Sequence, residues 1–179
     1  MGCVTVASRV PAGVRAGGQF AATLRPDAGE ALSAPVPSYA ETVPLTHTEL
    51  EGIFRDPNLP DRERFVTLAH TLAEQHPYEV GRTRIVFHTN TDVMKVPIAE
   101  EGLLDSWREA NWSQRYGKTG EIPIATAVEE FIDDVPVLRM ERVRMPTREE
   151  HHTLPRWTGS VDCAQVGWTA AGELVAFDL

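Results

Sequence analysis

The sequence predicts an α+β domain with a helix pair, a mixed or antiparallel sheet built from hairpins, and helices on one face of that sheet. Helical periodicity recurs within residues 46–76 and 98–115, and strand-forming segments come in pairs separated by short turns. Strands and helices do not alternate regularly, as a doubly wound parallel sheet would require. We expect one such domain over residues 45–179, after an irregular leader and linker over residues 1–44.

The leader is poor in residues that build a core. Residues 9–22 hold three glycines, one proline and a single aromatic side chain. Prolines and glycines stay frequent up to residue 44, which argues against a helix or a central strand. This segment is either a flexible tail or a strap that docks on a partner. The residues that we predict to bind in the second case are Gly17, Gly18, Gln19 and Phe20.

The leader also resembles a known pattern. The residues that carry the resemblance are Arg9, Pro11, Ala12, Gly13, Gly17, Gly18, Gln19, Phe20 and Ala21, with Leu45-Thr46 further on. They resemble the RxPAGxxxGGQFA leader of uncharacterised actinobacterial, plasmid and actinophage proteins. The resemblance implies an actinobacterial or mobile-element source, and it implies no particular activity.

The first helix is predicted to begin after Thr46, because Thr46 and Glu49 form the pattern of a capping box. Leu45 and Leu50 stand at the positions of a hydrophobic staple around this start. A second helix is predicted over residues 61–76, where apolar residues recur at the spacing of one buried helical face. The short link between them predicts a helix pair.

Strand formers follow in residues 83–89 and 92–96, which predict a hairpin with a turn at Asn90-Thr91. The next helix is predicted over residues 98–115. Its inward face is expected to consist of Leu103, Leu104, Trp107 and Ala110.

The remaining elements are a helix, a strand and a hairpin. Residues 124–134 predict a helix, because Val128, Phe131 and Ile132 fall at helical spacing. A strand is expected over residues 137–145. A second hairpin is expected from strands over 161–168 and 173–178.

Charge limits the class of partner. The formal net charge of −9 argues against general nucleic-acid binding, because such binding depends on positive charge. It suits a basic protein partner better. The tripeptide Gly17-Gly18-Gln19 also resembles that of peptidyl-tRNA hydrolysing release factors, and the acidic chain argues against that role.

Cysteine content and hydropathy bear on location. No apolar run approaches membrane-spanning length, and the first residues lack the charged and apolar regions of a secretory signal. Cys3 and Cys163 are too few for a disulfide framework and could equally be free thiols. We therefore expect a cytoplasmic protein without a membrane partner.

The sequence contains no motif that is known to bind a metal ion or a cofactor. The histidines lack metal-site spacing, and a site built from His88, His151, His152 and Cys163 has no support from spacing. Gly117-Lys118-Thr119 lacks the upstream glycine of a phosphate-binding loop, so a turn is expected there. We expect no metal ion and no cofactor.

Arginine and tryptophan supply the remaining candidates. The arginines at positions 139, 142, 144, 148 and 156 could bind phosphate or an acidic partner, but we favour neutralisation of nearby acidic residues. Trp112 and Trp157 could anchor a protein interface, where tryptophan is enriched. Core packing is the default expectation for both, and we name Trp157 as a candidate binding residue.

The favoured function is a small protein-binding regulator or inhibitor, without enzymatic activity, from an actinobacterial mobile element or phage. A homo-oligomer is also compatible with the sequence. One alternative is an enzyme with dispersed catalytic residues, such as a nucleotide or ADP-ribose transferase that uses Arg84, His88 and a glutamate. The other is a structural or assembly component of a phage particle.

Overall fold

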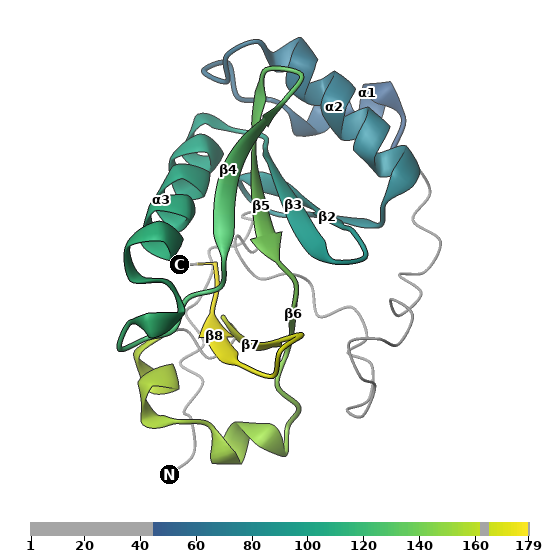
Figure 1. Cartoon of the computed structure of the whole chain (residues 1–179). Helices are drawn as coiled ribbons and strands as arrows, with labels where there is room; N and C mark the ends of the chain where they lie inside the picture. Colours follow the sequence, from purple (N-terminus) through teal and green to yellow (C-terminus); the bar gives the residue numbers. More distant parts are fainter. Residues whose placement is uncertain (1–44, 162–164, 179) are drawn as a thin grey trace, which may run out of the picture.

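The computed structural model describes residues 45–161 and 165–178. These residues form three α-helices and two antiparallel sheets, of five and three strands (Figure 1). The α+β prediction is confirmed. The leader residues and Cys163 lie outside the described residues.

The five-stranded sheet contains β1 (Tyr78–Val80), β2 (Arg84–His88), β3 (Asp92–Pro97), β4 (Ala127–Ile132) and β5 (Val135–Glu141), and the helices are α1 (His47–Ile53), α2 (Arg62–Gln75) and α3 (Glu100–Tyr116). The three-stranded sheet contains β6 (Val143–Arg144), β7 (Val166–Thr169) and β8 (Leu174–Ala176). The 3-10 turns are η1 (Gly117–Thr119), η2 (Glu150–Thr153) and η3 (Arg156–Ser160).

The larger sheet has the strand order β1-β2-β3-β5-β4, with antiparallel neighbours throughout. The smaller sheet has the order β6-β7-β8. A parallel bridge from Ile124 to Ala176 joins the segment before β4 to β8. The two predicted hairpins therefore exist, as β2–β3 and β7–β8.

One face of the larger sheet is covered by α1 and α2. Leu50 of α1 and Phe54, the residue after this helix, are fully buried and pack with Phe65 of α2 against Ile85 and Phe87 of β2. The predicted capping box is present, since the Thr46 hydroxyl accepts from the Glu49 backbone N–H and Glu49 accepts from the Thr46 N–H. The helix pair and its start are thus confirmed.

The other face of the larger sheet is covered by α3. Ala110 of this helix packs against the cluster that contains Val86, Leu138 and Met140. The prediction of helices on one face is therefore wrong in this detail. Successive side chains of a strand point to opposite faces of the sheet, and both faces are apolar here. Ile85 and Phe87 lie on one face and Val86 lies on the other, so helices must cover both faces to bury them.

The helix predicted over residues 124–134 is also wrong, because this segment forms β4 and the turn that leads to β5. Val128, Phe131 and Ile132 match helical spacing by coincidence. The turn at Asp133 and Asp134 has positive φ at both residues, 50° and 64°, as in a type I′ hairpin. Aspartate at both positions is an uncommon signal for this turn, which more often contains glycine.

This turn gives a stability prediction. Asp133→Asn with Asp134→Gly is expected to raise the free energy of unfolding by about 1 kcal/mol, since both replacements tolerate positive φ better. The exposed contact between Arg64 and Asp134 is lost, at little cost. Thermal denaturation measures the change, with Asp133→Ala as the control that should destabilise. A double variant no more stable than the natural chain would contradict the turn assignment.

Candidate functional site

Four charged side chains meet between α3 and the larger sheet. Arg84 of β2 and Lys95 of β3 both point to the face that α3 covers, and both are buried. Glu109 comes from α3, and Asp178 follows β8. The Lys95 and Glu109 side chains are only 3% and 4% exposed, so these charges are almost wholly removed from water.

Each cation of this buried charge cluster contacts both carboxylates. Glu109 Oε1 lies 2.5 Å from Arg84 Nη1, and Glu109 Oε2 accepts a hydrogen bond of 2.7 Å from Lys95 Nζ. Asp178 Oδ1 accepts from Arg84 Nη2 at 2.7 Å and from Lys95 Nζ at 3.1 Å. Two positive and two negative charges therefore balance, which limits the cost of burial.

Asp178 depends on this balance. Burial alone would raise the pKa of its carboxyl, but the charges of Lys95 and Arg84 outweigh it and hold the pKa below the ordinary value. Its backbone has φ of 56°, a left-handed conformation that turns the chain into the cluster. The carboxylate thus stays ionised while it neutralises the two cations.

The inner face of α3 is made of small and polar residues. Gly102, Ser106, Glu109 and Ser113 are buried along one stripe of the helix. At Gly102 a Cβ would clash with the Thr83 carbonyl, so glycine allows close contact with the chain before β2. At Ser113 the hydroxyl accepts a hydrogen bond of 2.8 Å from the Ala127 N–H.

The outer face of α3 exposes three large apolar side chains. Leu104 is 51% exposed, Trp107 is 56% exposed and Trp112 is 45% exposed. The prediction that Leu104 and Trp107 face inward is wrong, whereas Leu103 and Ala110 are partly buried as expected. The physical reason is the buried charge cluster, because a helix that turns Glu109 toward Lys95 cannot turn Trp107 toward the sheet.

Arginines border the exposed aromatic residues. Arg108 and Arg115 are both exposed on α3, and the Arg115 guanidinium lies 5.4 Å from the Tyr116 ring centroid. The exposed residues of this helix are Glu100, Glu101, Leu104, Trp107, Arg108, Trp112, Gln114, Arg115 and Tyr116, and we call them the α3 outer face. Tryptophan, tyrosine and arginine are the residue types that dominate binding energy in protein interfaces.

The buried charge cluster has no room for a substrate. The cavity beside Glu109 and Asp178 has a free volume of about 10 Å³, which is about the space for one water molecule. Arg84 is held by two carboxylates, and His88 lies at the far end of β2 with its Nε2 3.5 Å from a Glu79 oxygen. The structure thus brings Arg84 to a glutamate, Glu109, but not to an open site.

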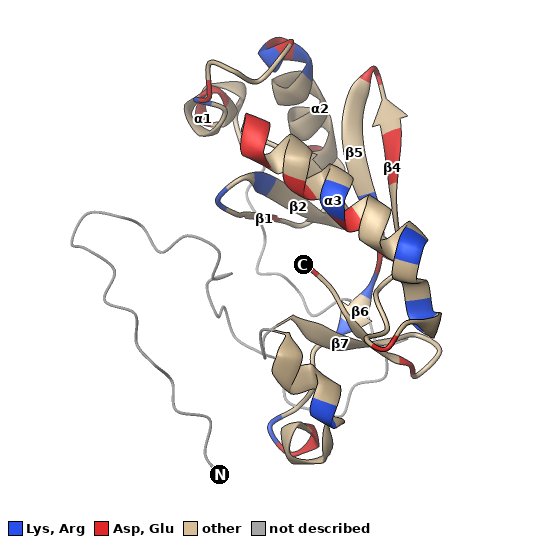
Figure 2. Ribbon diagram, turned by 90° about the vertical axis from the view of Figure 1, so that its left-hand side faces the viewer, with Lys and Arg blue, Asp and Glu red and all other residues tan. Residues whose placement is uncertain are grey.

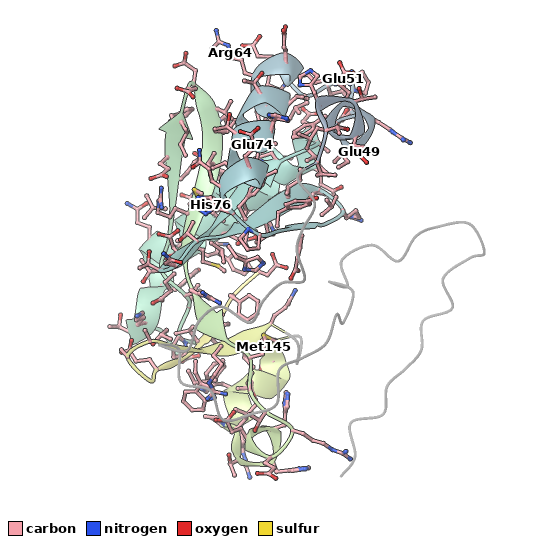
Figure 3. All side chains as sticks on the ribbon, turned by 90° about the vertical axis from the view of Figure 1, so that its right-hand side faces the viewer. Glu49, Glu51, Arg64, Glu74, His76 and Met145 are labelled. Carbon is pink, nitrogen blue, oxygen red and sulfur yellow. The ribbon has the colours of Figure 1, made fainter. Side chains whose placement is uncertain are left out.

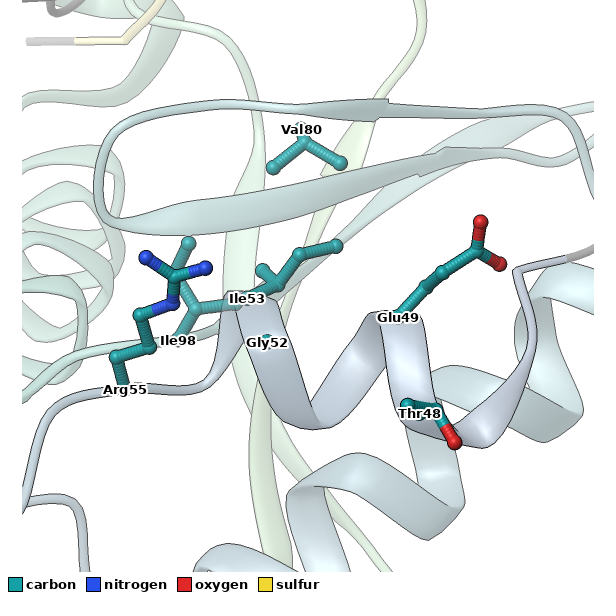
Figure 4. Close-up of a pocket in the computed structure, with 7 residues that line it drawn as sticks. All are labelled: Thr48, Glu49, Gly52, Ile53, Arg55, Val80 and Ile98. Atoms are coloured by element: carbon teal, nitrogen blue, oxygen red, sulfur yellow. The ribbon is translucent and has the colours of Figure 1, made fainter.

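A second hollow of about 620 Å³ lies between α1 and the edge strand β1 (Figure 4). Ile53, Val80 and Ile98 contribute apolar side chains to it, and Glu49 and Arg55 stand at opposite ends. Both charged residues are exposed. This wide groove therefore lacks the convergent buried polar groups that are typical of a small-molecule site.

The structure places some of the predicted candidates and leaves others untested. Gly17, Gly18, Gln19 and Phe20 lie outside the described residues, so their binding role stays a prediction. Trp157 of η3 is partly exposed and packs against the cluster of Val166, Leu174 and Ala176. Lys118 lies in the turn η1, where it pairs with Glu141 and Glu173.

The predicted neutralisation of arginines is present in part. Arg139 pairs with Glu130 and with Asp92, and Arg144 pairs with Glu150. Arg144 and the Thr147 backbone lower the pKa of Glu150 to about 2. Within residues 45–161 and 165–178, no group of three or more His, Cys, Asp or Glu side chains is placed to hold a metal ion.

Comparison of the chain with protein-family models, curated proteins and solved structures gave no match. Among the described helices, none is long and apolar enough to cross a membrane.

Sequence reasoning did not find the buried charge cluster. One signal was available, because Lys95 stands in the otherwise apolar strand Val93-Met94-Lys95-Val96. A lysine in such a run needs a buried carboxylate if both faces of the strand are covered. The sequence does not show which carboxylate this is, since Glu109 and Asp178 follow Lys95 by 14 and 83 residues.

The cluster is expected to stabilise the fold only as a balanced unit. Lys95→Met leaves two carboxylates for one cation and should cost about 3–5 kcal/mol of unfolding free energy. Lys95→Met with Asp178→Asn restores the balance and should cost less than the sum of the single variants, by about 1–3 kcal/mol. Chemical denaturation of the four proteins measures this coupling. Additive losses would show that the charges do not act together.

The lowered pKa of Asp178 predicts a dependence of stability on pH. The pKa of this carboxyl is lower in the folded chain than in the unfolded chain, where it is near 3.8. Its ionised form therefore stabilises the fold at any pH above about 3.8, and this stabilisation is lost as the pH falls further. The natural chain should therefore lose more unfolding free energy between about pH 5 and 3 than the Asp178→Asn variant does. Equal losses in denaturation curves would contradict the prediction.

Proposed function

We propose that this protein is a protein-binding regulator that engages its target through the α3 outer face. The observation that carries the proposal is the combination of Leu104, Trp107 and Trp112 with Arg108 and Arg115 on one exposed helix. Large apolar side chains are costly to keep in water, and surfaces that expose several of them mark interaction sites.

The rigidity of α3 also supports this role. The cluster contacts of Glu109 and the hydrogen bond to Ser113 hold the helix at two points of its inner face. A surface that is fixed before binding loses little conformational entropy when the partner arrives. The target therefore meets aromatic side chains on a backbone that is already in place.

The distribution of charge defines the chemistry of the target. Acidic residues mark the beginning of α3 and basic residues its end, as Figure 2 shows. We propose a target segment with an apolar ridge, a basic group opposite Glu101 and an acidic group opposite Arg115. This pattern adds electrostatic specificity to the apolar contact.

The sequence supports the biological setting of the proposal. The resemblance of the leader to actinobacterial and actinophage proteins favours a host or defence protein as the target, encountered in the cytoplasm. Docking by Gly17, Gly18, Gln19 and Phe20, or by Trp157, would add a second contact and is independent of α3.

The proposal is tested by direct binding. A target recovered with the full-length protein by affinity capture from an actinobacterial host is purified, and its affinity is measured by calorimetry. Trp107→Ala and Arg115→Glu should each weaken the complex at least about tenfold, because tryptophan and arginine dominate binding energy in protein interfaces. Both residues are exposed, so the variants should keep their thermal stability within about 0.5 kcal/mol.

Arg64→Glu is the matched control for Arg115→Glu. Arg64 is an exposed arginine on α2, seen from the opposite side of the molecule in Figure 3. Its variant should bind as the natural chain does. Unchanged affinity in Trp107→Ala and Arg115→Glu would overturn the proposed use of α3.

A further inference from the structure

The α3 outer face is complementary to itself when a second copy is turned by a two-fold axis. Glu100 and Glu101 lie in the first turn of α3 and Arg115 lies in its last turn. Figure 2 shows this polarity along the helix, with the acidic end near α2 and the basic end away from it. Glu101 already pairs with Arg82 of the same chain. In an antiparallel contact of two such helices, Arg115 of one copy joins this Glu101–Arg82 pair of the other copy at both ends.

The apolar residues follow the same symmetry. Arg108 is at the middle of α3, and Glu101 and Arg115 are equally distant from it along the helix. Leu104 and Trp112 are also equally distant from Arg108. A two-fold axis beside Arg108 therefore sets Glu101 opposite Arg115, and Leu104 opposite Trp112, of the other copy.

We infer that the α3 outer face forms a homodimer in which the two α3 helices pack antiparallel. This inference rests on the proposed function, because it concerns the same surface. A second copy of the chain covers the α3 outer face when the target is absent. The dimer covers Leu104 and Trp112, and a target that uses these side chains must displace the second copy to bind.

The two-fold axis brings the Arg108 side chains of both copies near each other. This repulsion is reduced by Asp105 of the same helix, which lies 3.8 Å from Arg108. Arg108 is also placed to contact the faces of the tryptophans from the second copy, a favourable arrangement for a guanidinium.

The helix alone is too small for a stable interface. It is about 25 Å long and about 10 Å wide, whereas stable interfaces bury about 800 Å² on each partner. Phe131 extends the surface, since it is 71% exposed and lies on the same face of β4 as Ala127, the face that α3 covers. The dimer is therefore expected to include the β4–β5 hairpin and to have micromolar affinity.

The test is sedimentation equilibrium of the full-length protein from about 1 to 500 µM, a range that covers weak dimers. The natural chain is expected to dimerise. Glu101→Arg and Arg115→Glu should each weaken the dimer at least about tenfold, because each places like charges together at two symmetric positions. The double variant, which exchanges the two charges, should recover dimerisation.

Glu74→Arg is the matched control for Glu101→Arg. Glu74 is an exposed acid on α2, far from the α3 outer face, as Figure 3 shows from the opposite side. A natural chain that stays monomeric at all concentrations would overturn the dimer and leave the proposed function to its own binding test. Dimers that both single charge variants leave unchanged would overturn the antiparallel arrangement.

Recovery in the double variant separates this dimer from a general loss of folding. Leu104→Asp gives a second readout, because it should abolish association without a change in the unfolding midpoint at low concentration. Target binding that depends on Trp107 in a protein that remains monomeric would support the proposed function alone.

Discussion

The contact between Lys95 and Glu109 determines how α3 lies on the sheet. A lysine side chain that is 3% exposed needs a carboxylate partner, because an unpaired charge in the protein interior costs several kcal/mol. Glu109 places one carboxylate oxygen against Lys95 and the other against Arg84. The side chains of a helix keep fixed positions around its axis. A rotation of α3 that points Glu109 toward the sheet therefore points Leu104 and Trp107 toward solvent. The exposed aromatic surface is thus a consequence of the buried charges.

This arrangement reverses the usual division of a helix into an apolar inner face and a polar outer face. The inner stripe of α3 is held by a close approach at Gly102, by the charges at Glu109 and by a hydrogen bond at Ser113. Such polar contacts are directional, so they fix the position of the helix more narrowly than apolar packing does. On the outer face, Leu104 and Trp107 are more than half exposed, and Trp112 is 45% exposed beside the small cavity at Glu109. This exposed apolar surface is why we assign the outer face to binding.

Local signals predicted local structure well. The capping box at Thr46, the apolar stripe of α2 and the turn between β2 and β3 each depend on residues close together in the sequence, and each is confirmed. The failures have non-local causes. The β4–β5 hairpin is stabilised by pairing with β3, which overrides the helical spacing of Val128 and Phe131. The face of α3 was mispredicted because apolar periodicity carries no information about the partners of a distant lysine.

The same reasoning explains why the candidate site could not be predicted. Asp178 reaches Arg84 across 94 residues of sequence, and it closes the cluster only when β8 lies beside the segment that precedes β4. The Ala125 N–H donates to the Ala176 carbonyl at this junction, two residues before Asp178. Contacts of such separation require the closure of a long loop, which costs conformational entropy. The orientation of α3, and with it the proposed binding surface, therefore depends on the pairing of β8 in the completed fold.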